Sequence, residues 1–356
     1  MTKKKICILA PFLSGKGGTE TILCTCIQML AKYYDVTLIL ANGVGETSWL
    51  HGLESDAVIK IIESTNKVSQ VAQLLRIYRR QRFEASIVLS TNLLLLVHYF
   101  QKFFLRRHTL ISWIHYSLNH EHTVDPSRLK FADYHFAISS GIANQMKNLG
   151  ISSEKIYTIY NAVEAKQISK YSPNNQVCRF VYIGRIMLDG QKNLRLLFDS
   201  LAKFPEDWQL DIYGTGADTE KCKGYVQKLG IASHVHWKGY VEKAWDNISD
   251  VTALLLSSQF EGFPMVLLEA LSYGIPVVSV NCPTGPADMI DDAVNGVLVR
   301  SMSSDMFEKS LIKVTHKQYD SEHIKSSIAS YYLDAYEERL IGSLEMILDG
   351  RKIRND

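Results

Sequence analysis

The sequence predicts an α/β protein with two open domains, each a parallel sheet covered by helices on both faces, which face each other across a ligand cleft. Short β-branched apolar runs alternate with longer amphipathic segments through roughly 300 residues, a pattern typical of parallel sheets. A length of 356 residues suits two domains of roughly 150 residues each. The hydrophobic content of 46% supplies two cores and argues against a disordered chain.

The first half of the sequence carries a first set of predicted strands and helices. The strands are short apolar runs, at residues 6–10, 36–40, 86–89, 110–113 and 134–138. The helices are amphipathic segments, at residues 19–33, 68–80 and 140–149. The first run follows three lysines, but it is short and interrupted by Pro11, so we expect a strand and not a signal peptide. The apolar stretch 87–100 is shorter than the roughly 20 residues of a membrane span, and no transmembrane helix is expected.

The second half repeats the pattern after a polar interruption. Its strands are predicted at residues 180–183, 209–213, 235–237, 253–256 and 276–280, and its helices at residues 193–203, 219–229 and 264–273. The interruption is KQISKYSPNNQ at residues 166–176, which we interpret as the domain linker. We therefore expect one domain over residues 1–168 and a second over residues 169–330. The remaining residues 331–356 contain a helix with no strand after it, a candidate for packing back on the first domain.

Charge is divided unevenly between the two halves. Residues 1–170 contain 20 Lys and Arg against 12 Asp and Glu, an excess of +8, and the remainder contains 19 against 25, or −6. This asymmetry indicates that the N-terminal half faces an anionic partner, either nucleic acid or an anionic membrane or glycolipid. The six cysteines form no CxxC pair and no zinc-type spacing with histidine, as expected of reduced thiols in a cytosolic protein.

Residues 253–280, ALLLSSQFEGFPMVLLEALSYGIPVVSV, carry the strongest functional signal. A buried strand is followed by a polar turn that contains Glu261. Pro264 lies near the first helical position, where its missing N–H costs nothing, and Gly274 ends the helix. Glu261 is therefore expected at the carboxyl end of a strand, where the ligands of open α/β sheets bind.

Two glutamates of this segment are candidates for binding a nucleotide-sugar. Glu269 lies more than a turn inside the helix, and a carboxylate among leucines is costly unless it binds something, such as the two hydroxyls of a ribose. The turn and the helix dipole suit a diphosphate, and Glu261 would reach the hydroxyls of the sugar. The backbone facing this ligand would be that of Gly262, Phe263, Pro264, Met265 and Val266. The structural alternative is that Glu261 caps the helix and that Glu269 is paired with a core Arg or Lys.

The spacing of Glu261 and Glu269 in EGFPMVLLEALSYGIPVV resembles the signature of the family 4 retaining glycosyltransferases. The resemblance implies the GT-B fold, in which two Rossmann-like domains face each other, and a nucleotide-diphosphate sugar as the donor. No metal or other cofactor is expected, since neither an Asp-x-Asp motif nor the spacing of His120 and His122 supports one. The matching positions span about residues 6–300 and are specific at the level of the family.

The other matching positions follow in the order of that family. Gly17 and Gly18, with Glu20 after them, resemble its N-terminal glycine-rich loop, and His115 resembles the histidine beside the donor sugar. The diphosphate clamp and a glycine turn of the second domain are matched by Gly184, Arg185, Lys192, Gly214 and Gly216. Tyr240, which follows a glycine, is a candidate for contact with uracil. The resemblance implies catalytic roles for Glu261, His115, Arg185 and Lys192, and donor binding by Glu269 and the glycines.

Each of these residues also has a plain structural interpretation. Arg185 could bind a diphosphate leaving group with two parallel hydrogen bonds, and Lys192 could bind it as a point charge. Two solvated surface cations would give the same pattern. A lone histidine such as His115 is more often structural than a ligand. The glycines could serve ordinary tight turns, because GKGG fits a dinucleotide fingerprint poorly, and Glu20 could cap the following helix.

A closer resemblance concerns the substrate. The runs ADYHFAISSGI, LGIASHVHWKGY and VTALLLSSQFEGFPMVLLEALSYGIPVVS resemble the lipopolysaccharide core 1,6-galactosyltransferases of enteric bacteria. This resemblance implies UDP-galactose as the donor and a glucose of the lipopolysaccharide core as the acceptor. The alternatives are a transferase that uses UDP-glucose or UDP-N-acetylglucosamine on another cell-surface glycan, a UDP-sugar epimerase on the same fold, and a non-catalytic nucleotide-sugar binding protein.

A basic and aromatic stretch in the first half is the candidate membrane contact. Its members are Arg76, Arg79, Arg80, Arg82, Phe100, Lys102, Phe103, Phe104, Leu105, Arg106, Arg107 and His108. A solvated helix face is the structural alternative. The functional interpretation is docking on anionic lipid or phosphorylated lipopolysaccharide, which would place the protein in the cytoplasm, at the inner face of the cytoplasmic membrane. Nucleic acid is not expected, because no recognition motif accompanies these charges.

Overall fold

The computed structural model of the chain describes residues 3–15, 17–64, 66–104, 107–121, 123–172 and 177–355, with side chains up to residue 350. The chain forms two compact units. Unit 1 consists of Met1–Ala162 and Asp334–Asp356, and unit 2 consists of Val163–Leu333. Each unit has its own parallel sheet and its own apolar core.

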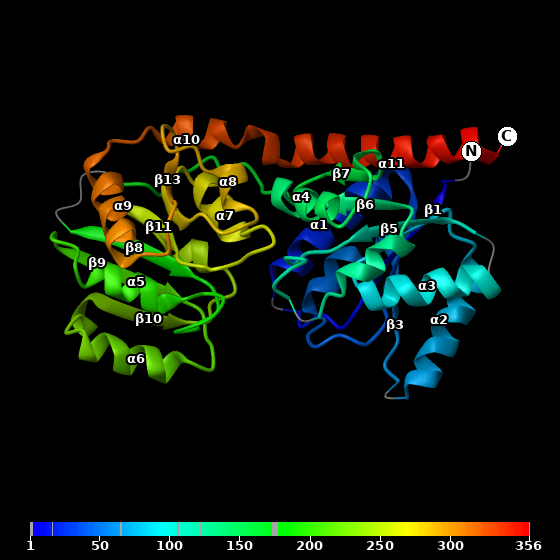
Figure 1. Cartoon of the computed structure of the whole chain (residues 1–356), viewed down its shortest axis with the longest axis horizontal. Helices are drawn as coiled ribbons and strands as arrows, with labels where there is room; N and C mark the ends of the chain where they lie inside the picture. Colours follow the sequence, from blue (N-terminus) through cyan, green and yellow to red (C-terminus); the bar gives the residue numbers. More distant parts are fainter. Residues whose placement is uncertain are drawn as a thin grey trace. The chain divides into compact units, whose positions relative to one another are not determined.

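Unit 1 is built on a seven-stranded parallel sheet (Figure 1). Its strands are β1 (Lys5–Ala10), β2 (Asp35–Leu40), β3 (Ala57–Ile61), β4 (Ala85–Val88), β5 (Thr109–Trp113), β6 (Tyr134–Ala137) and β7 (Ile156–Thr158), and its helices are α1 (Gly18–Tyr33), α2 (Lys67–Gln81), α3 (Thr91–Phe103), α4 (Ser140–Asn148) and most of α11 (Leu333–Asn355). The strand order is β3-β2-β1-β4-β5-β6-β7. The order reverses between β1 and β4, and ligands of open α/β sheets bind at the carboxyl ends of strands beside such a reversal.

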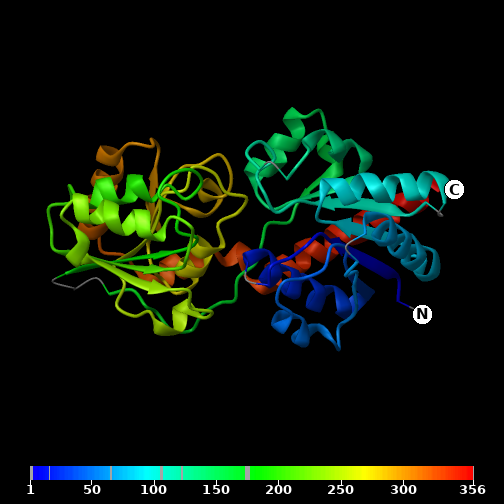
Figure 2. The same ribbon diagram turned by 90° about the horizontal axis from the view of Figure 1, so that it is seen from below.

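Unit 2 repeats this architecture with a six-stranded parallel sheet (Figures 1 and 2). Its strands are β8 (Cys178–Ile183), β9 (Trp208–Tyr213), β10 (Val235–Gly239), β11 (Ala253–Leu256), β12 (Val277–Val280) and β13 (Gly296–Val299), and its helices are α5 (Leu194–Leu201), α6 (Thr219–Lys228), α7 (Met265–Ser272), α8 (Pro286–Met289), α9 (Ser304–His316) and α10 (Ser321–Ser327). The strand order is β10-β9-β8-β11-β12-β13. The reversal therefore lies between β8 and β11.

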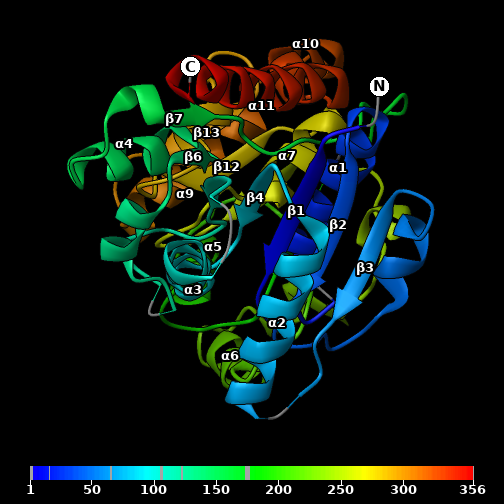
Figure 3. The ribbon, with the colours of Figure 1, turned by 90° about the vertical axis from the view of Figure 1, so that its right-hand side faces the viewer.

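Helices cover the sheets, and short 3-10 helices join several elements. In unit 2, α9 packs against α5, β12 and β13, and α10 packs against α7. Figure 3 shows α11 of unit 1 in red above β1 and β2. α11 contacts the end of α1, where Lys32 Nζ donates to Glu337 Oε2 at 2.6 Å, and its Tyr336 is fully buried. The 3-10 helices are η1 (Ser48–Leu53), η2 (Pro126–Phe131), η3 (Ser153–Lys155), η4 (Ala232–His234), η5 (Ala244–Asn247) and η6 (Ala329–Tyr331).

The two parallel-sheet α/β domains predicted from the sequence are confirmed, and the elements that the pattern does not predict have identifiable reasons. β3 is only partly buried along its length, so its sequence AVIKI contains a lysine and no continuous apolar run. β7 and β13 are short edge strands of 3 and 4 residues. Part of the apolar stretch 87–100 is α3, which buries Leu93, Leu94 and Val97. Among the described residues, no helix combines the length and the apolar composition that a membrane span requires.

The chain enters unit 2 at Val163, before the predicted boundary at residue 168. Residues of the predicted linker bind to unit 2: the Lys170 N–H donates to the Tyr273 carbonyl at 3.0 Å, and the Ser172 N–H donates to the Val251 carbonyl at 3.0 Å. The segment is polar because it runs over the surface, and its backbone hydrogen bonds tie it to the second sheet. Residues 173–176 of the predicted linker lie outside the described residues.

Part of the predicted basic and aromatic stretch forms an exposed surface on α2 and α3. Tyr99, Phe103 and Phe104 are 44%, 63% and 55% exposed. The Lys102 ammonium lies 5.6 Å from the Phe103 ring centroid, and the Arg79 guanidinium lies 5.7 Å from that of Phe104. We call these five residues the aromatic surface. Phe100 and His108 of the predicted stretch are buried, and Leu105 and Arg106 lie outside the described residues.

Candidate active site

The predicted site residues of unit 2 gather at the carboxyl edge of its sheet. Gly184 and Arg185 follow β8, and Glu261 follows β11, the neighbour of β8 at the reversal of strand order. Gly214 follows β9 and Tyr240 follows β10. Because the carboxyl ends of parallel strands share one edge, a ligand bound at this edge could contact all of these loops.

Lys192 and Glu261 form an ion pair at the reversal. Lys192 Nζ lies 2.6 Å from Glu261 Oε1, and their side chains are only 15% and 10% exposed. The Ser257 hydroxyl donates to the Lys192 carbonyl at 2.9 Å, and the Thr284 hydroxyl donates to the Glu261 carbonyl. Breaking so buried a pair would leave one uncompensated charge. A ligand that carries both a phosphate and hydroxyls could replace the pair, because it would offer a new partner to each residue.

Arg185 is exposed and lies on the same loop as Lys192. Its Nη2 donates to Gln191 Oε1 at 2.6 Å, and Gln191 Nε2 donates to the Phe260 carbonyl at 3.2 Å. The Gln259 N–H also donates to the Gln191 carbonyl at 2.8 Å. Gln191 thereby joins the loop after β8 to the loop after β11. It is uncharged and belongs to no motif, so the sequence contains no signal that identifies it.

Gly214 and Gly216 allow a close approach between two backbones. Gly214 has a φ of 140°, and a Cβ there would lie 1.9 Å from the Gly184 carbonyl oxygen. A Cβ on Gly216 would lie 2.0 Å from the Ile186 carbonyl oxygen. The Gly184 N–H donates to the Tyr213 carbonyl at 2.9 Å across the same contact. The turn after β9 therefore supports the loop after β8, a more specific role than that of an ordinary tight turn.

The N-terminus of α7 lies directly after this loop. Its N-cap is Pro264 and has no side-chain capping bond, so Glu261 does not cap the helix. The first N–H groups of α7 have no intrahelical partner and are available to an anion. A Cβ on Gly285, which follows β12, would lie 2.4 Å from Pro264 Cδ, a contact that the sequence does not predict. The predicted ligand-facing positions divide into buried Phe263 and Pro264 and half-buried Gly262, Met265 and Val266.

Glu269 is bonded to a tryptophan and not to a core Arg or Lys. Its Oε2 accepts a hydrogen bond from Trp245 Nε1, in η5, at 2.8 Å. Burial raises the pKa of the Glu269 carboxyl, and the Trp245 bond and the charge of Lys166 oppose that rise. A carboxylate in this environment is costly, as the sequence indicates, and its partner is an aromatic residue that no motif singles out.

Tyr240 lies at the end of β10 and is 50% exposed. It follows Gly239, which has a φ of 71° and whose carbonyl accepts a hydrogen bond from the Gly214 N–H at 2.7 Å. Tyr240 thus stands beside the glycine turn, with its ring open to solvent. A flat ring in this place could stack on a nucleobase.

The glycine-rich loop of unit 1 is held by Glu20. Its Oε1 accepts hydrogen bonds from the Gly15 N–H at 2.8 Å and the Ser14 hydroxyl at 3.3 Å, and its side chain is buried. A Cβ on Gly17 would lie 2.7 Å from Glu20 Oε2. Gly18 is the first residue of α1. Glu20 therefore stabilises the loop itself, so a ligand would meet the loop backbone and not this carboxylate.

His115 follows β5 in unit 1. Its Nε2 is buried and has no hydrogen-bond partner among the described residues. Its ring lies edge-on to Trp113, with centroids 4.3 Å apart. Burial lowers the pKa of His115 to about 3, so the imidazole is neutral at physiological pH. A buried polar atom without a partner is a candidate for binding a ligand hydroxyl.

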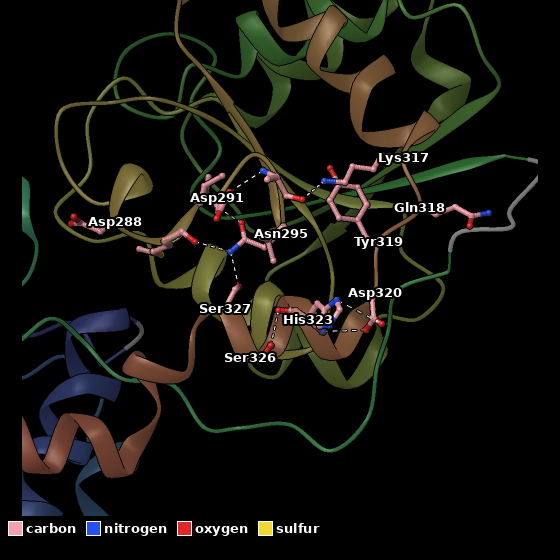
Figure 4. Close-up of a pocket in the computed structure, with 14 residues that line it drawn as sticks. Asp288, Asp291, Asn295, Lys317, Gln318, Tyr319, Asp320, His323, Ser326 and Ser327 are labelled. Carbon is pink, nitrogen blue, oxygen red and sulfur yellow. Dashed lines mark hydrogen bonds and ion pairs between the residues drawn. The ribbon is translucent and has the colours of Figure 1, made fainter.

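A pocket of about 700 Å³ in unit 2 lies away from these residues (Figure 4). It is lined by Asp291, Asn295, Lys317, Tyr319 and His323, among others, and none of the predicted site residues lines it. Asn295 directly precedes β13, so the pocket opens toward the amino end of that strand, opposite to the edge where ligands of such sheets bind. Within the described part of the chain, no three His, Cys, Asp or Glu side chains cluster as a metal site, and His122 lies outside that part.

Comparisons with known proteins agree with this architecture. A solved structure of HepE from Anabaena in complex with UDP-glucose is 17% identical, covers 95% of this chain and 99% of its own, and has a TM-score of 0.74, which shows the shared fold. The solved apo form of WaaB, a lipopolysaccharide outer core galactosyltransferase, is 31% identical and has a TM-score of 0.84 over 98% of this chain and 99% of its own.

Two findings identify the family. The family model for glycosyl transferases group 1 matches residues 163–329, which carry the Lys192–Glu261 pair and Glu269. The lipopolysaccharide 1,6-galactosyltransferase of Salmonella typhimurium is 34% identical over 92% of this chain and 95% of its own length. The chain therefore belongs to the group 1 glycosyltransferases, and its similarity to the lipopolysaccharide 1,6-galactosyltransferases extends over almost its whole length.

Proposed function

We propose that this glycosyltransferase moves galactose from UDP-galactose onto a glucose of the lipopolysaccharide core, with retention of the anomeric configuration. The observation that carries the proposal is the buried Lys192–Glu261 pair at the reversal of strand order in unit 2. A cation and a carboxylate in this place suit the two parts of a nucleotide-sugar, its diphosphate and its hexose. The activity printed for the relatives, lipopolysaccharide 1,6-galactosyltransferase, supports this donor and this acceptor.

Donor binding in this proposal uses the whole carboxyl edge of unit 2. Glu269 accepts hydrogen bonds from the ribose hydroxyls, and Tyr240 stacks on the uracil. Arg185, Lys192 and the N-terminus of α7 hold the diphosphate, whose negative charge grows as the glycosidic bond breaks. Two cations and a helix dipole supply this stabilisation, so the proposal needs no metal and no other cofactor. The UDP-glucose bound to HepE shows a fold of this kind holding a UDP-sugar.

The transfer itself exchanges one bond at the anomeric carbon for another. The bond from C1 to the β-phosphate oxygen breaks, and its electron pair leaves with UDP. The acceptor hydroxyl oxygen forms the new bond to C1 on the same face, and its proton passes to the β-phosphate oxygen. Glu261 binds hydroxyls of the transferred sugar, the buried His115 Nε2 binds a hydroxyl of the substrate, and neither residue acts as a nucleophile. This arrangement differs from the paired carboxylates of a glycosidase.

The proposed site of work is the inner face of the cytoplasmic membrane. The aromatic surface of unit 1 supports this placement, because it presents three exposed rings with Lys102 and Arg79 beside them. Aromatic rings at the headgroup level and cations toward anionic lipid are the usual means of peripheral attachment. Docking there would bring a lipid-anchored acceptor to the enzyme.

UDP release by the purified protein tests the activity. We would offer UDP-galactose, UDP-glucose and UDP-N-acetylglucosamine, each with and without truncated lipopolysaccharide that bears an exposed glucose. The proposal predicts release from UDP-galactose only when the acceptor is present. Acceptor-dependent release from another donor would contradict the galactosyl assignment, and consumption of UDP-galactose without an acceptor would favour an epimerase. Measurable UDP binding without release from any pair would contradict this acceptor and favour a binding protein.

Flotation with lipid vesicles tests the membrane contact. Vesicles that contain anionic phosphatidylglycerol should bind the protein, and the double variant Phe103→Ser, Phe104→Ser should bind roughly 10-fold more weakly. Val58→Ser is the matched control, since Val58 is 53% exposed on β3 of the same unit. Equal binding of the double variant and the control would contradict the proposed surface.

A further inference from the structure

Trp245 holds one oxygen of the Glu269 carboxylate and leaves the other free. Its indole N–H donates to Glu269 Oε2 at 2.8 Å. Among the described residues, Glu269 Oε1 has no hydrogen-bond partner. A carboxylate with one oxygen fixed and one unoccupied is oriented for a further donor. Glutamate has three rotatable bonds, so an external partner is needed to hold it in one direction.

Trp245 is itself fixed from two sides. Its ring packs on Tyr273, at the end of α7, with centroids 5.3 Å apart. The Lys170 ammonium donates to the carbonyls of Trp245, at 2.5 Å, and Ile248, at 2.6 Å. The same ammonium lies 5.2 Å from the Tyr273 ring centroid. A neighbouring ring therefore holds the indole, and a cation on the segment that enters unit 2 holds the Trp245 backbone.

We propose that Trp245 is a positioning residue for the donor nucleotide: its N–H turns Glu269 so that Oε1 faces the ribose hydroxyls. This inference rests on the proposed function, in which Glu269 binds the ribose. A ligand diol needs an acceptor in a defined direction, and a carboxylate that has to be ordered on binding costs affinity. Trp245 removes that cost before the ligand arrives.

The Trp245 N–H also favours the ionised form of the Glu269 carboxyl. Burial raises the pKa of Glu269, while the Trp245 bond lowers it and Lys166 lowers it through its charge. Tyr273, whose pKa is raised by burial, Lys170 and Asp246 also lie in this cluster. Loss of the indole N–H is therefore expected to raise the pKa of Glu269 further. UDP binding in such a variant should weaken at a higher pH than in the wild type, because a protonated carboxyl is a poorer acceptor.

Calorimetric UDP affinity between pH 5 and 8 tests the proposal in Trp245→Phe, which keeps a ring on Tyr273 and removes the donor. The expected result is a roughly 10-fold weaker affinity at neutral pH, the usual size for a hydrogen bond to a charged group. The pH at which binding weakens should also shift upward. Trp237→Phe is the matched control: Trp237, on β10, packs edge-on to Phe198 of α5, and the variant should bind UDP as the wild type does.

A double-mutant cycle separates positioning from general loss of structure. Trp245→Phe should lose little affinity in a Glu269→Ala background, because the residue that it orients is gone. Lys170→Met, which keeps the indole N–H but removes its anchor, should give a smaller loss that also depends on Glu269. Lys170→Met, alone and in the Glu269→Ala background, keeps the test decisive if thermal unfolding shows that Trp245→Phe folds poorly.

The outcomes distinguish this inference from the proposed function. Weak UDP binding by Glu269→Ala, with wild-type binding by Trp245→Phe at every pH, would overturn the positioning role alone. An equal loss from Trp245→Phe in both backgrounds would do the same. Wild-type UDP binding by Glu269→Ala would overturn the ribose contact of the proposed function, and the positioning role with it.

Discussion

The carboxyl edges of the two sheets differ in how fully their polar side chains are paired. In unit 2, Lys192 and Glu261 lie 2.6 Å apart, and Glu269 accepts from Trp245 at 2.8 Å. In unit 1, His115 Nε2 is buried without a partner among the described residues, and Glu20 binds its own loop.

We infer from this difference which kind of ligand each edge suits. At the edge of unit 2, Lys192 and Glu261 neutralise each other. A diphosphate and a sugar that bind there would replace this ion pair with new partners, so neither residue is left as an unpaired buried charge. The edge of unit 1 offers a neutral imidazole, which suits a hydroxyl, and the backbone of a glycine-rich loop. We therefore propose that the diphosphate of the donor binds at the carboxyl edge of unit 2.

We expect the largest effect on activity from removal of the Glu261 carboxylate, at the reversal of strand order in unit 2. Glu261→Ala should lower kcat by roughly 10²–10³ in the UDP-release assay, the range found for loss of a group that acts in the transition state. UDP affinity should change much less, because Glu261 is assigned to the sugar. Asp305→Ala is a control, since the Lys203–Asp305 pair has a similar length of 2.7 Å but is 49% and 70% exposed. Unchanged kcat in Glu261→Ala would remove this residue from the catalytic role.

The second prediction concerns the contact between the loops after β8 and β9, which Gly214→Ala would break. Gly214→Ala would place a Cβ 1.9 Å from the Gly184 carbonyl oxygen at a φ of 140°. We expect a loss of about 3 kcal/mol in the free energy of unfolding and a large loss of UDP affinity. Gly224→Ala, in α6, has nothing within 4 Å of the new Cβ and should stabilise by about 0.5–1 kcal/mol. Wild-type stability and UDP affinity in Gly214→Ala would contradict the supporting role of the turn.

The third effect concerns the second glutamate. Glu269→Ala should weaken UDP binding by roughly 10–100-fold, because two hydroxyls lose a charged acceptor. Equal UDP affinity of this variant and the wild type in calorimetry would refute the ribose assignment.

A measurement of stability against pH tests whether the ionised Glu269 carboxylate costs stability. Since burial raises the pKa of Glu269 in the folded protein, folding favours the protonated form. The stabilisation is present below the unfolded pKa and is lost as the pH rises through the folded value. Glu269→Gln has no such proton to lose and should be more stable than the wild type by about 1 kcal/mol at pH 7, but not at pH 4. A variant that is less stable at pH 7 would show that the ionised carboxylate does not cost stability.

The smallest expected effect is on His115. Its pKa of about 3 predicts that its imidazole signals in NMR do not titrate between pH 5 and 8. The protein unfolded in denaturant serves as the control, because a solvated imidazole titrates in that range. Titration of His115 near pH 6.5 would mean that the imidazole is solvated and not held neutral by burial.

Sequence reasoning was most successful where local pattern decides structure. The strand–turn–helix around Glu261, the end of α7 at Gly274 and the parallel sheets follow from apolar runs, Pro and Gly, and the structure has all of them. The edge strands β3 and β7 did not follow, because partial burial leaves no clear apolar period, and β13 did not follow, because its apolar run spans only 4 residues.

The residues that organise the site were harder to predict. Gln191, Trp245 and Gly285 act through contacts between loops that are far apart in sequence. No spacing rule relates such loops, so a sequence shows only that Glu269 needs a partner and not which residue supplies it. The role of Glu20 could not be predicted from the sequence either, because it depends on which backbone N–H groups face its carboxylate.

The central claim is that the carboxyl edge of unit 2 binds the diphosphate of the donor, and calorimetry of UDP against uridine tests it most directly. The account predicts that the wild type binds UDP at least roughly 10-fold more tightly than uridine, as a charge-assisted phosphate contact would provide. It also predicts that the double variant Arg185→Ala, Lys192→Ala binds the two ligands about equally. Similar affinities for UDP and uridine in the wild type, or a full preference for UDP in the double variant, would contradict the account.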